Sequence, residues 1–449
     1  MKTFIGLPTL AAIACFILLT ACASSETSIV KNLESPSPST AAPVSRQPFI
    51  AQVVGLQWLN PLQRRDYPTE WQLLWTLGLT GPNKEDDMVR SKPEKYSSLQ
   101  PVGSIAVGNN GRESFDGYHE KYIRELIAPM HDIYFSRSSY FYNAHSVKDQ
   151  STRRELAGIH IEYALPAGRL DRSEAAATTR DKILEMFEIG NPNFPEAWSR
   201  NTPPDVRVTL GGPNAGFTSL AAALDYLQAH QDETVWAMNW DAPSRPQDKQ
   251  INENMVLLVL AGPDYKTERE PLAWIGYPAS HSAADFEKKS DLPPRIAQAW
   301  KATLDNAVSN AGKAPTDIGY VIHDANNTHA DSSDRIGNLA DILITQVAEF
   351  DFIKQSFNTP ALLGGMGAGT ALTNVALGVA YANHLGKSVL IAGTSELAQP
   401  TAVLVVPPAK VRPIDHDKDW FRARGENNAH LMWWGIRHDA DFRMQGYSK

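Results

Sequence analysis

Hydrophobic residues along the chain follow two spacings, one typical of strands and one typical of helices. Residues 50–56 are mostly apolar and predict a buried strand, and residues 159–165 alternate as a strand does. In 58–79, 118–130 and 174–187 the apolar positions recur every three or four residues, which predicts helices. Strands that alternate with helices indicate an α/β protein.

A pattern of glycine turn, helix, strand and strand occurs twice, about 150 residues apart. The first copy begins at the turn 211–216 and the second at the turn 364–369. Each turn leads into an Ala-rich helix whose small side chains suit close burial. The predicted helices are 217–229 and 370–383, and the predicted strands are 235–240, 255–260, 388–393 and 401–406. This duplication predicts two equivalent halves.

The first 22 residues resemble a bacterial signal peptide. Lys2 precedes an apolar stretch, 4–19, that is short for a membrane span. The sequence Leu19-Thr20-Ala21-Cys22 resembles the lipobox, at which bacterial lipoproteins are cleaved and lipidated on the cysteine. The alternative is an uncleaved anchor or a start codon placed too early, which leaves the body in the cytoplasm.

Cysteine content, charge and motifs narrow the classes of function. Both cysteines, Cys15 and Cys22, lie in the signal-like segment, so the body holds no thiol and no internal disulfide. A net charge of −8 offers no broad basic surface for phosphates, so no nucleic-acid partner is expected. Residues 393–397 only imitate a nucleophile elbow, and the sequence has no phosphate loop or zinc-protease motif.

The duplicated glycine turn, buried helix and strand pair resembles the thiolase and ketoacyl-synthase superfamily. The stretch 297–323 supports the resemblance, because a predicted helix, 297–311, is followed by Gly312 to Ile318, which is similar to the ageing turn before a catalytic-histidine strand. The resemblance implies an α/β, thiolase-like fold. Its two similar halves consist of layered helices and mixed sheets, and the signal-like segment precedes them.

In those enzymes the first glycine turn carries a cysteine whose thiolate attacks an acyl thioester. Here the turn offers Asn214, Ala215 and Gly216, and none of these is a nucleophile. The second turn reads Gly365-Met366 where a synthase carries Gly-His. One histidine, His323, does not suffice for acyl transfer, so the expectation is a protein that is not an enzyme.

A more specific resemblance is to the type VI lipase adapter family of bacterial type VI secretion systems. Four segments carry it: 236–246, 323–334, 362–370 and 420–441. In that family the adapter receives a phospholipase effector in the donor cell and brings it to the secreted spike protein. The resemblance implies a non-catalytic adapter or chaperone with these two partners, a cytoplasmic location and no cofactor. A homodimer stays open, because thiolase relatives usually dimerise.

Two other functions remain open at this point. The lipobox-like segment suggests an envelope lipoprotein, lipidated at Cys22, that acts in the periplasm as an immunity-type protein. A thioesterase or acyltransferase with a site rebuilt around His323 is the second alternative.

The chain divides by composition into five parts. Residues 1–22 are the signal-like segment, and residues 23–47, rich in Ser, Pro and Thr, predict an extended tether. The expected domains are an N-terminal adapter domain, 48–195, and a C-terminal thiolase-like domain, 196–408. An aromatic and arginine-rich tail, 409–449, follows them.

The tail supplies the candidate protein-binding residues. Aromatic and arginine side chains dominate binding hot spots, because they bury much area and pair charges. The alternative is a tail that packs on its own core. The candidates are Trp420, Phe421, Trp433, Trp434 and Arg437.

Two further clusters have a functional and a structural interpretation. A metal site is one interpretation of the histidines and aspartates in 323–334, but their spacing matches no defined motif, so a polar loop after a buried strand is favoured. The aromatic run 134–142 suggests either a groove or an edge strand, and its composition favours the strand. The residues of the first cluster are His323, Asp324, His329, Asp331 and Asp334. No metal, cofactor or catalytic residue is assigned.

Overall fold

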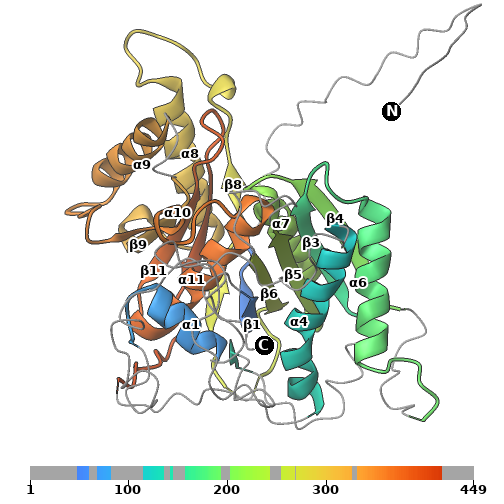
Figure 1. Cartoon of the computed structure of the whole chain (residues 1–449). Coiled ribbons are helices and arrows are strands. Elements are labelled where there is room, and N and C mark those ends of the chain that lie inside the picture. The colour runs from blue at the N-terminus through green and yellow to red at the C-terminus, as the bar shows by residue number, and fades with distance from the viewer. Residues whose placement is uncertain are drawn as a thin grey trace, which may run out of the picture. The chain divides into compact units, whose positions relative to one another are not determined.

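A computed structural model describes most of the folded body (Figure 1). The described residues are 48–59, 68–81, 115–135, 142–144, 157–193, 203–242, 254–267, 269–325 and 331–416. None of the helices among these residues is long and apolar enough to cross a membrane. The signal-like segment, the tether and the tail beyond residue 416 lie outside them.

The strands of the described residues form one mixed sheet whose strand order repeats. The first half has the order β4 (Asp205–Gly211), β3 (His160–Pro166), β5 (Thr234–Asp241), β6 (Asn254–Ala261), β1 (Ala51–Leu59). The second half has the order β10 (Ser356–Asn358), β9 (Ile318–His323), β11 (Ser388–Gly393), β12 (Thr401–Val406), β7 (Ala273–Ile275). In each half the first three strands are parallel and the last two are antiparallel to their neighbours. The predicted duplication is therefore confirmed.

The two halves join where β1 pairs with two strands. Residues 51–53 of β1 pair antiparallel with β7, and residues 52–59 pair antiparallel with β6. Two short strands, β2 (Tyr142–Asn143) and β8 (Ala279–Ser280), add to β1 and β12. The first repeat thus ends at residue 261 and the second begins at residue 273.

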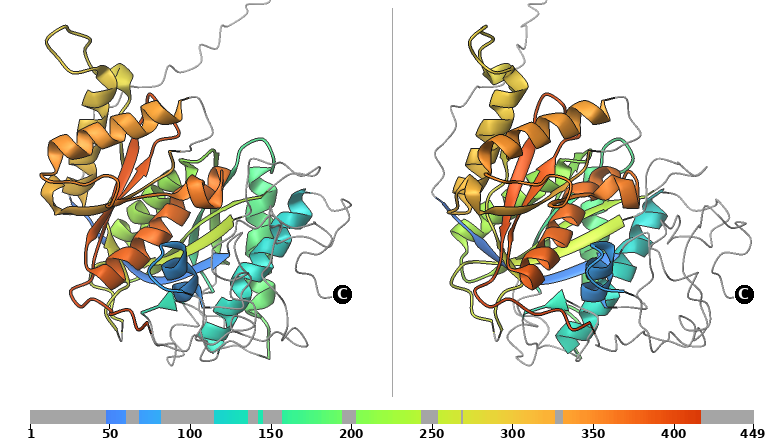
Figure 2. Two further views of the ribbon diagram at one scale, coloured as in Figure 1. Left: turned by 60° about the vertical axis from the view of Figure 1, so that its left-hand side comes forward. Right: turned by 90° about the vertical axis from the view of Figure 1, so that its left-hand side faces the viewer.

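Among the described residues, the six helices of 15 or more residues lie in three layers, one between the two halves of the sheet and one on the outer face of each half (Figures 1 and 2). Helices α7 (Ala215–Ala229) and α11 (Thr370–Leu385) share the central core with the inner faces of both halves. Helices α4 (Phe115–Phe135) and α6 (Arg172–Met186) cover the outer face of the first half. Helices α8 (Arg295–Asn310) and α9 (Ser332–Gln346) cover the outer face of the second.

The strands show why the sequence selects these layers. Successive side chains of a strand point to opposite faces of the sheet. In β5, Val235 and Ala237 belong to the central core, whereas Trp236 and Met238 belong to the outer core with α4 and α6. Both faces are apolar, which explains why these strands read as continuous hydrophobic runs.

Shorter elements complete the described part of the chain. They are α1 (Thr69–Thr76), α10 (Thr359–Leu363) and the 3-10 turns η2 (Ala283–Asp285), η3 (Pro315–Asp317) and η4 (Gly367–Gly369).

The helix predicted over 58–79 is wrong in its first part. Trp58 lies in β1, and its indole nitrogen donates a hydrogen bond of 2.7 Å to Asn254 Oδ1 on the neighbouring strand. The helix α1 covers only eight residues of the predicted range. The edge strand predicted over 134–142 is also wrong at its start, because Tyr134 and Phe135 end α4. Tyr142 does lie in a strand, where it pairs with Leu56 of β1.

Candidate functional site

The turn at the start of α7 is the first part of the candidate site. The helix begins at Ala215, and its N-cap residue Asn214 makes no side-chain capping hydrogen bond. The Oδ1 atom of Asn214 is buried and has no hydrogen-bond partner among the described residues. A primary amide is neither a nucleophile nor a base at neutral pH.

Asn214 packs against the end of a strand from the opposite half. A Cβ atom built on Gly393, the last residue of β11, would lie 2.6 Å from Asn214 Oδ1 and 2.7 Å from Phe217 Cε2. Only glycine fits at this position, because any other side chain begins with the atom that overlaps. At the start of α7, Asn214 and Phe217 therefore lie directly against the backbone of Gly393 in the second half.

The turn at the start of α11 makes the equivalent contact in the reverse direction. Gly367 has a φ of +50°, and a Cβ atom built on it would overlap the carboxylate of Asp241, the last residue of β5. Asp241 is 2% exposed. Its Oδ2 accepts the backbone N–H of Ala368 at 3.0 Å, and its Oδ1 pairs with Arg169 Nη1 at 2.9 Å. The Arg169 guanidinium also lies over the ring of Phe115, 3.8 Å from its centroid.

Two asparagines of the first half hold the first turn of α11. The side-chain amides of Asn239 and Asn254 each donate to the carbonyl oxygen of Gly369 at 2.8 Å. The Thr373 hydroxyl donates to the same oxygen at 2.7 Å. Both asparagines are fully buried in otherwise apolar strands, and a buried polar side chain in such a strand indicates a specific partner. This was the available signal, and the sequence reasoning missed both residues.

His323 and Asp324 lie together at the end of β9, as predicted. Burial of the His323 imidazole lowers its pKa to about 4, with Asp324 acting weakly in the opposite direction. Its Nδ1 accepts the backbone N–H of Ala325 at 3.3 Å, so the proton of the neutral ring is on Nε2. The ring lies 5.6 Å from that of Phe352. The ring thus contacts a backbone N–H group and an aromatic side chain, as a histidine that supports the fold does.

Asp324 holds the loop that follows β11. Its Oδ1 accepts hydrogen bonds from the backbone nitrogen and the hydroxyl of Thr394, at 2.5 and 2.8 Å. The Ser395 hydroxyl donates to Asp324 Oδ2. Since this hydroxyl is bound to a carboxylate and not to His323, the loop does not form a serine and histidine pair.

The remaining aspartates of the cluster in 323–334 have other contacts or positions. The carboxylate of Asp331 pairs with Arg335 at 2.6 Å, one helical turn further along α9. Asp334 faces outward into a groove beside α9. Across the part of the chain that the structure describes, no group of three or more His, Cys, Asp or Glu side chains is placed to hold a metal ion. His329 lies outside the described residues, as do Cys22, Trp420, Phe421, Trp433, Trp434 and Arg437.

Comparison with known proteins gives the fold. No protein-family model and no curated protein matches the chain. A ketosynthase from module 6 of the bacillaene synthase of Bacillus subtilis 168 is 10% identical with a TM-score of 0.51, covering 80% of this chain and 70% of the ketosynthase chain.

A second solved structure gives the same result. A type II polyketide synthase ketosynthase, in complex with its acyl-carrier protein, is 10% identical with a TM-score of 0.51, covering 80% of this chain and all of the matched chain. Likeness at this level of identity concerns the fold alone. Together with the repeated strand order, it shows that this chain has the thiolase and ketosynthase-like α/β fold.

Proposed function

We propose that this chain is a non-catalytic protein-binding scaffold on a thiolase-like fold. More specifically, we propose an adapter that receives a phospholipase effector and brings it to a type VI spike protein. The observation that carries the proposal is the turn at the start of α7, where Asn214 is packed against Gly393 and where Asn214, Ala215 and Gly216 offer no cysteine or other nucleophile.

Acyl transfer on this fold requires a nucleophile at a helix start, where the helix dipole and a nearby base activate it. The amide of Asn214 cannot form an acyl intermediate, and residues 23–449 contain no cysteine. His323 is buried and neutral and makes no hydrogen bond to a hydroxyl group within the described residues. The geometry therefore supports binding better than catalysis.

The adapter proposal rests on the resemblance of segments 236–246, 323–334 and 362–370. Asp241, Asp324 and Gly367 lie in these segments, and they are the residues that connect β5 with α11 and β9 with the loop after β11. These three residues thus connect parts of the fold that are distant in sequence. A fold fixed by buried contacts suits a protein that binds partners, because the chain loses little conformational entropy when the partner binds.

Titration calorimetry tests this proposal. The full chain is mixed separately with a type VI phospholipase effector and with a spike protein from the same organism. The expected result is saturable binding to both, at micromolar concentrations or below. Binding to neither protein would overturn the adapter function.

Cell fractionation tests the competing envelope function. A C-terminally tagged chain is compared with its Cys22→Ser variant. The expected result is a soluble cytoplasmic protein in both cases, because effector loading takes place in the cytoplasm. A membrane location that is lost with Cys22→Ser would replace the adapter with a lipidated envelope protein.

A further inference from the structure

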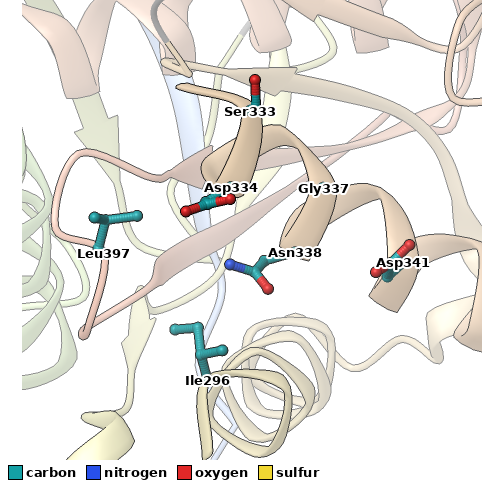
Figure 3. A pocket seen from close by; sticks show the side chains of 7 residues that line it. All are labelled: Ile296, Ser333, Asp334, Gly337, Asn338, Asp341 and Leu397. Atoms are coloured by element: carbon teal, nitrogen blue, oxygen red, sulfur yellow. The ribbon is translucent and has the colours of Figure 1, made fainter. Parts of the chain in front are cut away.

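A groove lies on the outer side of the second half, between α8, α9 and the loop after β11 (Figure 3). Its cavity volume is about 500 Å³. Helix α9 forms most of it, helix α8 contributes one side chain and the loop after β11 contributes another. The lining residues are Ile296, Ser333, Asp334, Gly337, Asn338, Asp341 and Leu397.

The carboxylates in this groove lack the side-chain cations that neighbouring acidic residues have. Asp331 pairs with Arg335 on α9, and Asp305 pairs with Lys301 on α8. Within the described residues, neither Asp334 nor Asp341 forms an ion pair or a side-chain hydrogen bond, and no lining residue is basic. The groove thus presents two carboxylates without a paired side-chain cation, beside apolar side chains.

The spacing of Asp334 and Asp341 along α9 equals the spacing of two side chains on one face of another helix. The two aspartates are seven residues apart, which is about two turns or 10 Å along α9. Between them lies Gly337, where an added Cβ atom would meet no other atom within 4 Å. The backbone of α9 is therefore open between the two charges, and a second helix can approach it closely.

Apolar side chains at the border make the groove amphipathic. Leu397, which lines the groove, is 41% exposed, and Ile296 lines it from α8. The loop that carries Leu397 is held in place, because Thr394 and Ser395 bind Asp324. This border is thus formed before any partner binds.

We propose that this groove binds a cationic amphipathic helix of a protein partner. Two Lys or Arg side chains, seven residues apart, pair with Asp334 and Asp341, and apolar side chains between them pack against Ile296 and Leu397. This inference rests on the proposed function as a binding scaffold. Carboxylates this far apart do not share one metal ion, and their charge repels nucleic acid.

The experiment uses two synthetic helical peptides and two variants of the full chain. One peptide has lysines seven residues apart with leucines between them, and the other has glutamates at the same two positions. The variant Asp334→Lys/Asp341→Lys reverses the charge of the groove. Asp232→Lys/Asp264→Lys is the matched control, since it reverses the charge of two exposed acidic residues that do not line the groove, one in the first half and one in the segment that follows it. Circular dichroism checks that each variant is folded, and fluorescence anisotropy measures binding.

The lysine peptide is expected to bind the parent chain and the control variant equally. Binding to the groove variant should be about tenfold weaker, because two exposed charge pairs are lost and become repulsive. The affinity for the parent chain should also fall with added salt. The glutamate peptide should not bind.

Three results would overturn the assignment of the groove: no binding of the lysine peptide, equal affinity for the two double variants, or binding of spermidine without binding of the peptide. The effector and spike proteins are titrated in parallel. If they bind the groove variant and the parent chain with equal affinity, the assignment of the groove as the binding site is wrong and the adapter function stands. If only the lysine peptide binds, and in the groove, the adapter function fails and the groove stands.

Discussion

The starts of α7 and α11 occupy equivalent places in the two halves but are stabilised in different ways. At α11, Asp241 accepts the N–H of Ala368 and pairs with Arg169, both within 3.0 Å. At α7, the amide oxygen of Asn214 meets the backbone of Gly393 and has no hydrogen-bond partner among the described residues. A buried carboxylate holds the start of α11, whereas at the start of α7 the backbone forms turn hydrogen bonds and the side chain of Asn214 adds close packing.

This difference bears on the proposed non-catalytic function. The N-terminus of a helix attracts anions. At α11 the protein supplies its own anion, Asp241, so the position is already filled. At α7 the neutral Asn214 supplies no reactive group. Variants that disturb the two starts should therefore differ in size of effect.

Gly367→Ala should have the largest effect. The new Cβ atom overlaps the buried carboxylate of Asp241, and the φ of +50° is itself unfavourable for alanine. The free energy of unfolding, measured with urea, should fall by about 3 kcal/mol or more. Gly212→Ala in the α7 turn is the control, because its Cβ atom would meet nothing within 4 Å. Equal stability of the two variants would refute the tight contact at α11.

Asp241→Asn should come second. The amide keeps the shape of the side chain and can accept the Ala368 N–H, but it removes the negative charge that pairs with Arg169. The expected loss is about 2 kcal/mol, less than for a fully buried pair, because Arg169 is 18% exposed. Urea unfolding measures it, and a loss below about 0.5 kcal/mol would mean that charge does not hold this start.

Gly393→Ala should destabilise the start of α7 by about 1 to 2 kcal/mol. The added methyl group forces Asn214 and the buried ring of Phe217 to move. In Asn214→Ala/Gly393→Ala one of the two overlaps is gone, so part of the loss should be recovered. Strictly additive effects in this double-mutant cycle would show that the two residues do not touch.

Acid should destabilise both halves through one buried histidine in each. Burial lowers the pKa of His119 to about 3 and that of His323 to about 4, so the unfolded chain binds more protons below pH 6.5. The stabilisation that comes from keeping each histidine neutral is fully present above pH 6.5 and is lost as the pH falls. The loss levels off near pH 4 for His323 and near pH 3 for His119. Each histidine should lower the free energy of unfolding by on the order of 2 kcal/mol between pH 7 and pH 5. His323→Gln should flatten the measured pH dependence, and an unchanged slope would contradict the neutral burial.

Asn214→Ala alone should have the smallest effect. Replacing an N-cap asparagine commonly costs about 1 kcal/mol, because a capping hydrogen bond is lost. Here no such bond exists, so the change in unfolding free energy should stay within about 0.5 kcal/mol. A larger loss would reveal a stabilising contact at this start.

The sequence was most informative where both faces of a strand are buried. The predicted strands 388–393 and 401–406 coincide with β11 and β12, because continuous apolar runs leave little doubt about their ends. The strand β4 was missed. It lies at a sheet edge, and the charged residues Asp205 and Arg207 within it hide the strand pattern.

Contacts between distant parts of the chain could not be predicted from local patterns. Arg169 and Asp241 are 72 residues apart, and the contact of Asn214 with Gly393 crosses from one half to the other. The polar loop expected over 323–334 extends too far, because α9 begins within it at Ser332, and no helix was predicted over the rest of α9. Acidic residues are in fact favourable in the first turn of a helix, since they oppose the helix dipole.

The central claim is that the start of α7 performs no acyl chemistry. The most direct measurement is mass spectrometry of the full chain after incubation with an acyl-CoA and an acyl-carrier thioester, followed by peptide mapping to set aside acylation of Cys15 and Cys22. The account predicts no acyl group on any peptide of residues 48–416. A covalent acyl group within that range, above all on the peptide that contains Asn214 to Ser219, would contradict it.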